Sequence, residues 1–189
     1  MKIIKENREF IPYKGDLPKI TKEGFQVVDV PSDVLKMLLG FYDRSKMIEE
    51  KYEGKDHYIK QKCYVQDINS NQEIVKYIKK ALQSVHEQWS GVKLNPAVLY
   101  GIRSYSNNSV FKEHVDQPKT HHIASSITLG KDCEWGLNIQ NHEGEWFSVD
   151  VPVGKMIMFE SGTVYHGRLE PFQGTYYDNI YMHYTFNGY

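Results

Sequence analysis

The feature that most restricts the fold is a change of pattern after Gly91. From there on, short runs rich in Val, Ile, Tyr, Phe and Thr alternate with Gly, Asn, Asp and Pro, at intervals of about eight to twelve residues. This pattern is typical of antiparallel strands, which it predicts over residues 97–105, 122–129, 135–140, 145–151, 155–160, 163–169 and 177–186. The sequence NHEG at 141–144 predicts a hairpin turn. So many short strands in one segment indicate a β-sandwich or a jelly roll.

The segment before Gly91 has helical spacing instead. Residues 31–53 begin with Pro and Ser, which favour a helix start, and carry one apolar stripe, with an interruption expected near Gly40. Residues 71–90 repeat apolar side chains at helical spacing from Ile74 to Trp89, with lysines between them. Both stripes are expected to pack against the sheet. The predicted fold class is therefore α+β, mainly β, with N-terminal helices that buttress a jelly roll.

Length and composition fit one domain. The chain has 189 residues, of which 40% are hydrophobic and 13% aromatic, and this is enough for one sizeable core. We expect a single domain over residues 1–189, with helical support at roughly 31–91 and a catalytic β core at roughly 97–187.

Charge and apolar content disfavour two classes of partner. Lys and Arg number 23 against 24 Asp and Glu, a formal net charge of −1, so no overall field attracts nucleic acid or anionic membranes. The first residues lack the apolar run of a signal peptide, and no stretch approaches the roughly 20 apolar residues of a membrane span.

Cys63 and Cys133 form neither a CxxC pair nor a framework of several bridges. This favours a reducing cytoplasm, and a single disulfide between the two remains an open alternative. We expect a cytoplasmic protein that binds no nucleic acid and no membrane.

Five of the eight histidines are expected outside any ligand set. His57 lies in a charged stretch, His86 falls between the core positions of the second helix, and His142 lies in the predicted turn. These three are expected to face solvent. His121 and His122 follow a Pro-Lys loop and are expected either to be part of the loop structure or to lie just outside the metal ligands, where either could face the mouth of the pocket.

A metal site is indicated by the motif HVD, which holds His114 and Asp116. On an extended segment residues i and i+2 share one side, so an imidazole and a carboxylate can converge on one ion. His166, in the segment YHGR, follows on a later strand of the same sheet and provides a third ligand. Two imidazoles and one carboxylate leave positions open on an octahedral ferrous ion, as in non-haem iron oxygenases. Zinc can use the same set, but the sequence has no HExxH motif, and the pattern favours iron.

Four blocks of the sequence resemble successive blocks of the 2-oxoglutarate- and iron(II)-dependent oxygenases, especially the prolyl 4-hydroxylase-like members. They are YGIRSYSNNSVFKEHVD, SSITLG, PVGKMIMFES and YHGRLEPFQG…YYDNIYMHYTF, within residues 97–187. The resemblance implies a double-stranded β-helix fold with His114, Asp116 and His166 as the iron ligands. It also implies Fe(II), 2-oxoglutarate and O2, with ascorbate as a further candidate. The implied reaction is hydroxylation of an unactivated C–H bond, coupled to oxidative decarboxylation of 2-oxoglutarate.

The sequence departs from this family where the far carboxylate of 2-oxoglutarate is bound. Similar enzymes place Lys or Arg about nine or ten residues beyond the distal histidine, and this chain has Thr175 and Tyr176 there. Arg168 shares the side of its strand with His166 and could make a bidentate contact from inside the barrel. The alternative is an ion pair between Arg168 and Glu170 at the rim.

Four more residues could complete the cosubstrate site. Arg103 is the reserve candidate for the carboxylate anchor. Tyr105, Thr128 and Tyr177 could add hydroxyl donors, as Tyr and Thr of equivalent strands do in similar enzymes. The alternative for these three is the role of ordinary strand residues.

The substrate is left open by the sequence. By resemblance the first choice is a prolyl residue in a peptide or protein, and the alternative is a free amino acid or another small metabolite. Residues 51–68 and the loop QPKTHH are expected to cover it. A nucleic-acid demethylase is disfavoured because the sequence has no basic stripe. A third reading is a non-catalytic, cupin-like protein that binds metal or ligand, and release of succinate would distinguish an enzyme from it.

Overall fold

The computed structural model describes residues 1–51 and 61–188. Its smaller sheet consists of β1 (Lys2–Glu6), β7 (Phe111–His114), β9 (Leu137–Gln140), β10 (Trp146–Asp150) and β12 (His166–Arg168). Its larger sheet consists of β2 (Phe25–Asp29), β3 (Ile48–Glu49), β4 (Cys63–Gln66), β5 (Leu94–Leu99), β6 (Ile102–Tyr105), β8 (Ile123–Lys131), β11 (Lys155–Phe159) and β13 (Tyr177–Phe186). The helices are α1 (Ser32–Phe41) and α2 (Gln72–Ser90), and a short 3-10 turn spans Arg44–Lys46.

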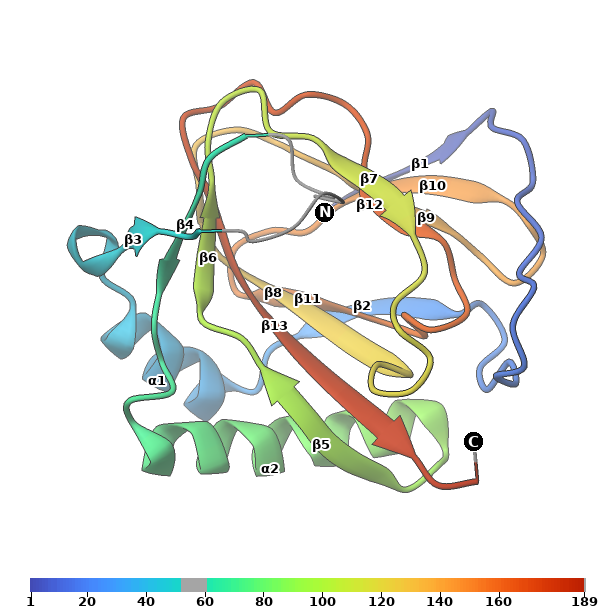
Figure 1. The fold of residues 1–189 in the computed structure, drawn as a ribbon, viewed down its shortest axis with the longest axis horizontal. Helices are drawn as coiled ribbons and strands as arrows, with labels where there is room; N and C mark the ends of the chain where they lie inside the picture. Colours follow the sequence, from blue (N-terminus) through green and yellow to red (C-terminus); the bar gives the residue numbers. More distant parts are fainter. Residues whose placement is uncertain (52–60, 189) are drawn as a thin grey trace.

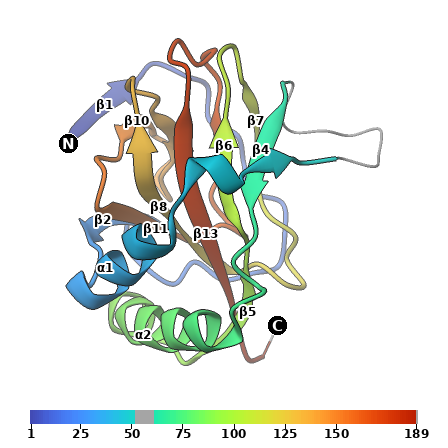
Figure 2. The same cartoon turned by 90° about the vertical axis from the view of Figure 1, so that its left-hand side faces the viewer.

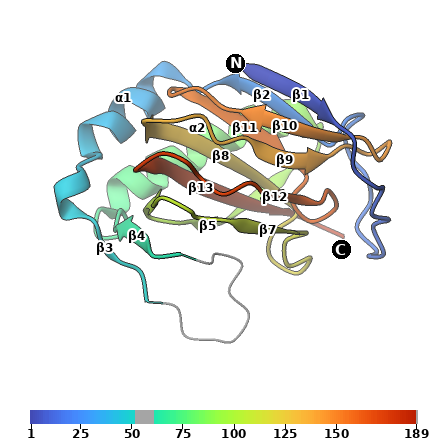
Figure 3. The same ribbon diagram turned by 90° about the horizontal axis from the view of Figure 1, so that it is seen from above.

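The two sheets face each other, and the helices cover the outer side of the larger sheet (Figures 1 and 2). The smaller sheet runs in the order β1-β10-β9-β12-β7. The larger sheet runs β2-β11-β8-β13-β6-β4-β3, and β5 pairs with β13. Seen from above, the smaller sheet lies over β8, β11 and β13 (Figure 3). The chain therefore forms the predicted double-stranded β-helix buttressed by N-terminal helices.

The second helix begins and ends close to where its sequence predicts. The Asn71 side chain accepts a hydrogen bond from the Ile74 N–H at 3.3 Å, which caps the first turn. At the other end Gly91 has a φ of 73°, the left-handed conformation that glycine adopts most easily. The apolar stripe of α2, which includes Ile78 and Leu82, is buried in the cluster between the helices and the larger sheet.

The first helix is shorter than predicted. It ends at Phe41, and Tyr42 has an extended backbone. Tyr42 leaves the helix because its hydroxyl donates a hydrogen bond to the buried Asp178 at 2.5 Å. The interruption expected near Gly40 therefore falls at Phe41. The predicted continuation of the helix toward residue 53 does not form an α-helix up to residue 51, and residues 52 and 53 lie outside the described part of the chain.

Each predicted strand region contains a strand, and one region is split. Residues 97–105 include the end of β5 and all of β6, separated by Tyr100 and Gly101. The Gln66 carbonyl oxygen lies 2.6 Å from where a Cβ at Gly101 would stand, so only glycine fits this break. Five strands were not predicted, namely β1, β2, β3, β4 and β7. Four of these five, β1, β2, β3 and β7, are edge strands. An edge strand pairs with a neighbouring strand on one side only, and its hydrophobic pattern is weaker.

The central strand β13 alternates between two environments. Ile180, Met182 and Tyr184 belong to the core beneath the helices. Tyr177 and Tyr181 belong to an aromatic cluster between the two sheets. This period of two, which follows from strand geometry, decides which side chains can reach the space between the sheets.

Two histidines that were predicted to face solvent do not do so. His86 is fully buried, and its Nδ1 lies 2.7 Å from the Leu82 carbonyl oxygen. It lies one turn after Leu82 and so falls on the apolar stripe of α2. His142 lies in the predicted turn, but its Nε2 is 3.0 Å from Glu160 Oε1 and its side chain is 6% exposed. His57 lies outside the described residues.

Glu160 ties the N-terminal segment to the barrel. Its carboxylate accepts hydrogen bonds from the backbone N–H groups of Ile20 and Thr21, at 2.8 and 2.7 Å, besides the His142 contact. Because this buried carboxylate is fully surrounded by donors, we expect Glu160→Gln to lower the free energy of unfolding by about 3 kcal/mol or more. Denaturant titration measures this. Glu134→Gln, at an exposed site, is the control and should change it by less than about 0.5 kcal/mol.

The same carboxylate should make stability depend on acid. Burial alone raises the pKa of Glu160, but the His142 imidazole and the donors of Thr21 and Ile20 outweigh burial and lower it below its ordinary 4.5. The stabilisation is therefore complete above the ordinary pKa and is lost as the pH falls through the lowered folded value. Glu160→Gln should flatten this acid limb. An acid limb identical to that of the wild type would contradict this account.

In the described part of the chain, no helix combines the length and the apolar character needed to cross a bilayer. Cys63 and Cys133, the two cysteines of the sequence, form no disulfide bond with each other.

Candidate metal centre

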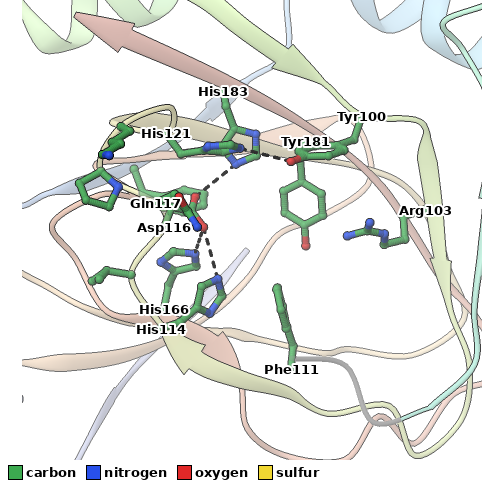
Figure 4. Close-up of a pocket in the computed structure, with 14 residues that line it drawn as sticks. Tyr100, Arg103, Phe111, His114, Asp116, Gln117, His121, His166, Tyr181 and His183 are labelled. Carbon is green, nitrogen blue, oxygen red and sulfur yellow. Dashed lines mark hydrogen bonds and ion pairs between the residues drawn. The ribbon is translucent and has the colours of Figure 1, made fainter. Parts of the chain in front are cut away.

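Strands β7 and β12 bring the two predicted imidazole ligands together. The strands are antiparallel neighbours, and His114 pairs in register with His166, with the ring centroids 4.4 Å apart. Asp116 follows β7 by two residues, where its backbone N–H donates to the Ser161 carbonyl at 2.8 Å. One ring nitrogen of each histidine and one carboxylate oxygen lie within 4.8 Å of one another (Figure 4). Residues 50 positions apart thus form one three-residue cluster that could hold a metal ion.

Backbone carbonyls orient both imidazoles. Nδ1 of His114 lies 2.9 Å from the Lys112 carbonyl oxygen, and Nδ1 of His166 lies 3.0 Å from that of Val164. When each Nδ1–H donates these bonds, each Nε2 keeps its lone pair. Those Nε2 atoms lie 3.3 and 3.9 Å from Asp116 Oδ1. The rings are therefore held in the tautomer and direction that metal ligation needs.

The electrostatics of the cluster favour the ligand forms. Burial lowers the pKa of His166 to about 4, so its imidazole is neutral near pH 7. Burial alone raises the pKa of Asp116, but the imidazoles of His114 and His183 hold it well below its ordinary value. A neutral imidazole and an ionised carboxylate are the states that bind a cation.

A cavity of about 700 Å³ opens in front of the three residues. Tyr100, Phe111 and Tyr181 give it aromatic walls (Figure 4). Arg103 also lines it and donates two hydrogen bonds to the Glu50 carboxylate, at 2.8 and 2.7 Å. The reserve anchor Arg103 is thus already engaged by an acid.

Arg168 lies deeper between the sheets, with 1% of its surface exposed. Its guanidinium donates to the Trp135 carbonyl and to the Tyr177 hydroxyl, the latter at 2.9 Å. It also lies over both rings, 4.8 Å from the Trp135 centroid and 4.2 Å from that of Tyr177. The Tyr177 hydroxyl is in turn 2.9 Å from Thr128 Oγ1.

Tyr105 connects this deep cluster to the cavity. Its hydroxyl lies 3.2 Å from the hydroxyl of Tyr181, which lines the cavity. The structure therefore gathers all four residues predicted for 2-oxoglutarate, Arg168, Tyr105, Thr128 and Tyr177, in one buried polar region behind the cavity wall. The cavity lining itself stops at Tyr181.

The alternative ion pair of Arg168 with Glu170 is not formed. Glu170 Oε1 lies 3.7 Å from Arg8 Nη2 instead. Within residues 1–51 and 61–188, Arg168 has no ion pair with any acid, and its Nε has no hydrogen-bond partner. Tyr176 lies beneath Arg44, whose guanidinium is 3.7 Å from the ring centroid. Arg168 is thus a buried cation without an acid partner in the described part of the chain.

The neighbouring histidines His121 and His122 differ from each other. His122 is buried, with Nε2 2.7 Å from the Pro118 carbonyl oxygen and Nδ1 accepting the Phe186 N–H at 3.1 Å. His121 lines the cavity. Neither belongs to the three-residue cluster of ligand atoms.

His121→Ala is expected to keep full metal binding and to reduce turnover modestly, because His121 borders the cavity outside the cluster. Metal content after anaerobic loading and desalting measures the first effect, and the rate of succinate release measures the second. A loss of metal equal to that of His114→Ala would show that His121 is a ligand.

Sequence reasoning missed His183. Its Nε2 lies 3.2 Å from Asp116 Oδ2, and its ring lines the cavity (Figure 4). The signal was present, because residues 177, 179, 181 and 183 share one face of a strand that was predicted correctly.

Comparisons with known proteins find their matches among solved structures. No model of a protein family matches the sequence, and no curated protein matches it. A prolyl-4-hydroxylase from Pseudomonas putida aligns with a TM-score of 0.63 and 16% identity, over 88% of this chain and 94% of that one. A Trichoplax adhaerens prolyl hydroxylase, in complex with a hypoxia inducible factor peptide, aligns at 0.61 and 13%, over 85% and 83%.

A third similar structure is HygX from Streptomyces hygroscopicus with nickel, 2-oxoglutarate and hygromycin B bound. It aligns with a TM-score of 0.62 and 9% identity, over 89% of this chain and 85% of that one. At sequence identities this low, the alignments support a shared fold only. The reaction has to be argued from the residues of the site. This chain has the double-stranded β-helix fold of the 2-oxoglutarate- and iron(II)-dependent oxygenases.

Proposed function

We propose that this protein is a 2-oxoglutarate- and Fe(II)-dependent dioxygenase that hydroxylates an unactivated C–H bond. The observation that carries the proposal is the convergence of His114, Asp116 and His166 on the wall of one cavity. Two imidazole nitrogens and one carboxylate oxygen on adjacent segments match the ligand set that leaves positions open on ferrous iron. The shared fold supports this assignment.

The residues of the chain fit both groups that the reaction needs. His114, Asp116 and His166 would hold the iron, which supplies the activation of O2 when bound. Arg168 would hold the far carboxylate of 2-oxoglutarate through its planar fork, because it is a buried cation without an acid partner in the described chain. Thr128, Tyr105 and Tyr177 would add hydroxyl donors.

In this proposal the protein contributes orientation and the exclusion of water. The backbone carbonyls of Lys112 and Val164 fix the imidazoles. The aromatic walls formed by Tyr100, Phe111 and Tyr181 shield the space beside the ligands and hold the target carbon there. Such preorganised positions suit chemistry that must not release a reactive species to water.

For the substrate we propose a prolyl residue in a peptide or protein. The aromatic walls of the cavity suit an apolar ring such as that of proline. The similar structures include a prolyl hydroxylase with a bound peptide and HygX with hygromycin B. A small molecule is therefore the alternative substrate class. Two cysteines that form no disulfide bond with each other fit the proposed cytoplasmic location.

A substrate panel tests the proposal. Iron-loaded protein, 2-oxoglutarate and ascorbate are incubated with proline-containing peptides, free amino acids and small metabolites under labelled dioxygen. Mass spectrometry then identifies any product that has gained one labelled oxygen atom, and succinate is quantified in the same samples. Asp116→Ala is the matched control. Labelled product from a small molecule and not from any peptide would refute the prolyl assignment. Metal binding without succinate from any sample would favour the non-catalytic, cupin-like reading.

A further inference from the structure

We propose that His183 positions Asp116 for metal binding by holding the carboxylate oxygen that the ligand cluster leaves free. This inference rests on the proposed function, because it takes Asp116 as a metal ligand. The two oxygens of Asp116 have different neighbours. Oδ1 faces Nε2 of His114 and of His166, at 3.3 and 3.9 Å, whereas Oδ2 lies 3.2 Å from Nε2 of His183 (Figure 4).

His183 stands outside the ligand set. The described cluster of ligand atoms within 4.8 Å of one another contains His114, Asp116 and His166, without His183. His183 also comes from β13 of the larger sheet, whereas the cluster is built on β7 and β12 of the smaller one. The Asp116 carboxylate is therefore held between the two sheets, with the imidazole ligands on one side and His183 on the other.

Aromatic neighbours fix the ring of His183. Tyr100 meets it edge-on with centroids 5.5 Å apart, His121 meets it edge-on at 4.2 Å, and Tyr181 lies at 6.4 Å with the planes 28° apart. The side chain is 8% exposed. A ring packed in this way keeps Nε2 beside Asp116 without help from a bound ligand.

Asp116 Oδ2 needs this neighbour. It is a buried oxygen without an aligned hydrogen bond, although Nε2 of His183 lies within hydrogen-bond distance. A buried carboxylate oxygen without a donor is costly, and a small rotation of the imidazole would align its N–H. With Oδ2 occupied in this way, Asp116 would offer Oδ1 alone to a metal. Loss of such an outer partner of a ligand typically weakens metal affinity about ten- to hundredfold.

Three substitutions separate hydrogen bonding from packing. His183→Gln can place an amide N–H near the position of Nε2 and should bind Fe(II) within about threefold of the wild type. His183→Asn is polar but one carbon too short, and His183→Phe keeps the ring without a donor, so both should bind Fe(II) about ten- to hundredfold more weakly. Anaerobic Fe(II) titration measures the dissociation constant, and the Co(II) absorption spectrum reports the ligand field. His121→Phe, which alters a ring packed on His183, is the control and should leave the affinity unchanged.

Several outcomes would overturn the role of His183. The first is an Fe(II) affinity within threefold of the wild type in both His183→Phe and His183→Asn. The second is equal weakening of Fe(II) binding in His183→Gln and His183→Asn, which would indicate that His183 acts through packing alone. If His183→Phe does not fold, the comparison of Gln with Asn decides. A wild type that binds no Fe(II) would overturn the proposed function itself. Tight binding in the wild type with no effect of any His183 variant would overturn this inference alone.

Discussion

Replacing His166 or Asp116 with Ala is expected to abolish stoichiometric Fe(II) binding, with a loss of affinity greater than about hundredfold. The reason is geometric, because the ion would lose one of three ligands that lie within 4.8 Å of one another. Outer partners of metal ligands already contribute about ten- to hundredfold, so removal of a ligand must exceed that range. Anaerobic titration, followed by metal analysis after desalting, measures the effect.

The substitutions should leave the fold intact. His166 and Asp116 form a cluster of polar side chains between the sheets, and the strands around them are held by backbone pairing. Near-ultraviolet circular dichroism and a thermal melt check this. His121→Ala serves as the control for the loss of a neighbouring imidazole. Full iron content in His166→Ala would refute the assignment of the distal ligand.

Replacing Arg168 is expected to remove most of the affinity for 2-oxoglutarate while Fe(II) stays bound. A charge-assisted bidentate bond contributes about 1.5 to 3 kcal/mol, which corresponds to a ten- to hundredfold increase in the dissociation constant for Arg168→Met. Arg168→Lys should rescue only part of this, because Lys keeps the charge and loses the planar fork. Titration of 2-oxoglutarate into the anaerobic Fe(II) protein, monitored by the charge-transfer band expected from the family resemblance, measures the constants.

Stability provides an independent check on Arg168. Without 2-oxoglutarate the Arg168 guanidinium is held by the Trp135 carbonyl, the Tyr177 hydroxyl and the faces of both rings. Arg168→Met fills a similar volume but loses these contacts and leaves the Trp135 carbonyl without this donor, so its unfolding free energy without 2-oxoglutarate should be lower than that of the wild type. Added 2-oxoglutarate should stabilise the wild type more than the variant. An unchanged dissociation constant in Arg168→Met would move the anchor to Arg103 or to the hydroxyls of Tyr176 and Tyr177.

The sequence was most informative where strands are buried. The regions of β8, β9, β10, β11 and β13 could be predicted because these are interior strands of their sheets, with a neighbour on each side, and their apolar residues leave a strong pattern. The HVD motif could be interpreted because spacing i, i+2 fixes two side chains on one side. The pairing of His114 with His166 could only be expected, because register between distant strands depends on how the whole sheet closes.

The failures have physical causes too. The edge strands β1, β2 and β7 were missed because one side of each has no neighbour to impose a pattern. His86 was placed in solvent because a polar residue type outweighed its position one turn from Leu82. His183 was overlooked although strand spacing places it on one face with Tyr177, because its contact with Asp116 joins the two sheets and spacing within one strand does not show which side chain of the other sheet it meets.

Succinate formation tests the central claim most directly. The protein is incubated with Fe(II), 2-oxoglutarate, ascorbate and O2, with and without the peptide panel, and succinate is quantified by nuclear magnetic resonance. The account predicts that succinate appears in step with the loss of 2-oxoglutarate, requires both Fe(II) and O2, and disappears in Asp116→Ala. The account would be contradicted if iron-loaded, folded wild type neither bound 2-oxoglutarate nor converted it to succinate under any of these conditions.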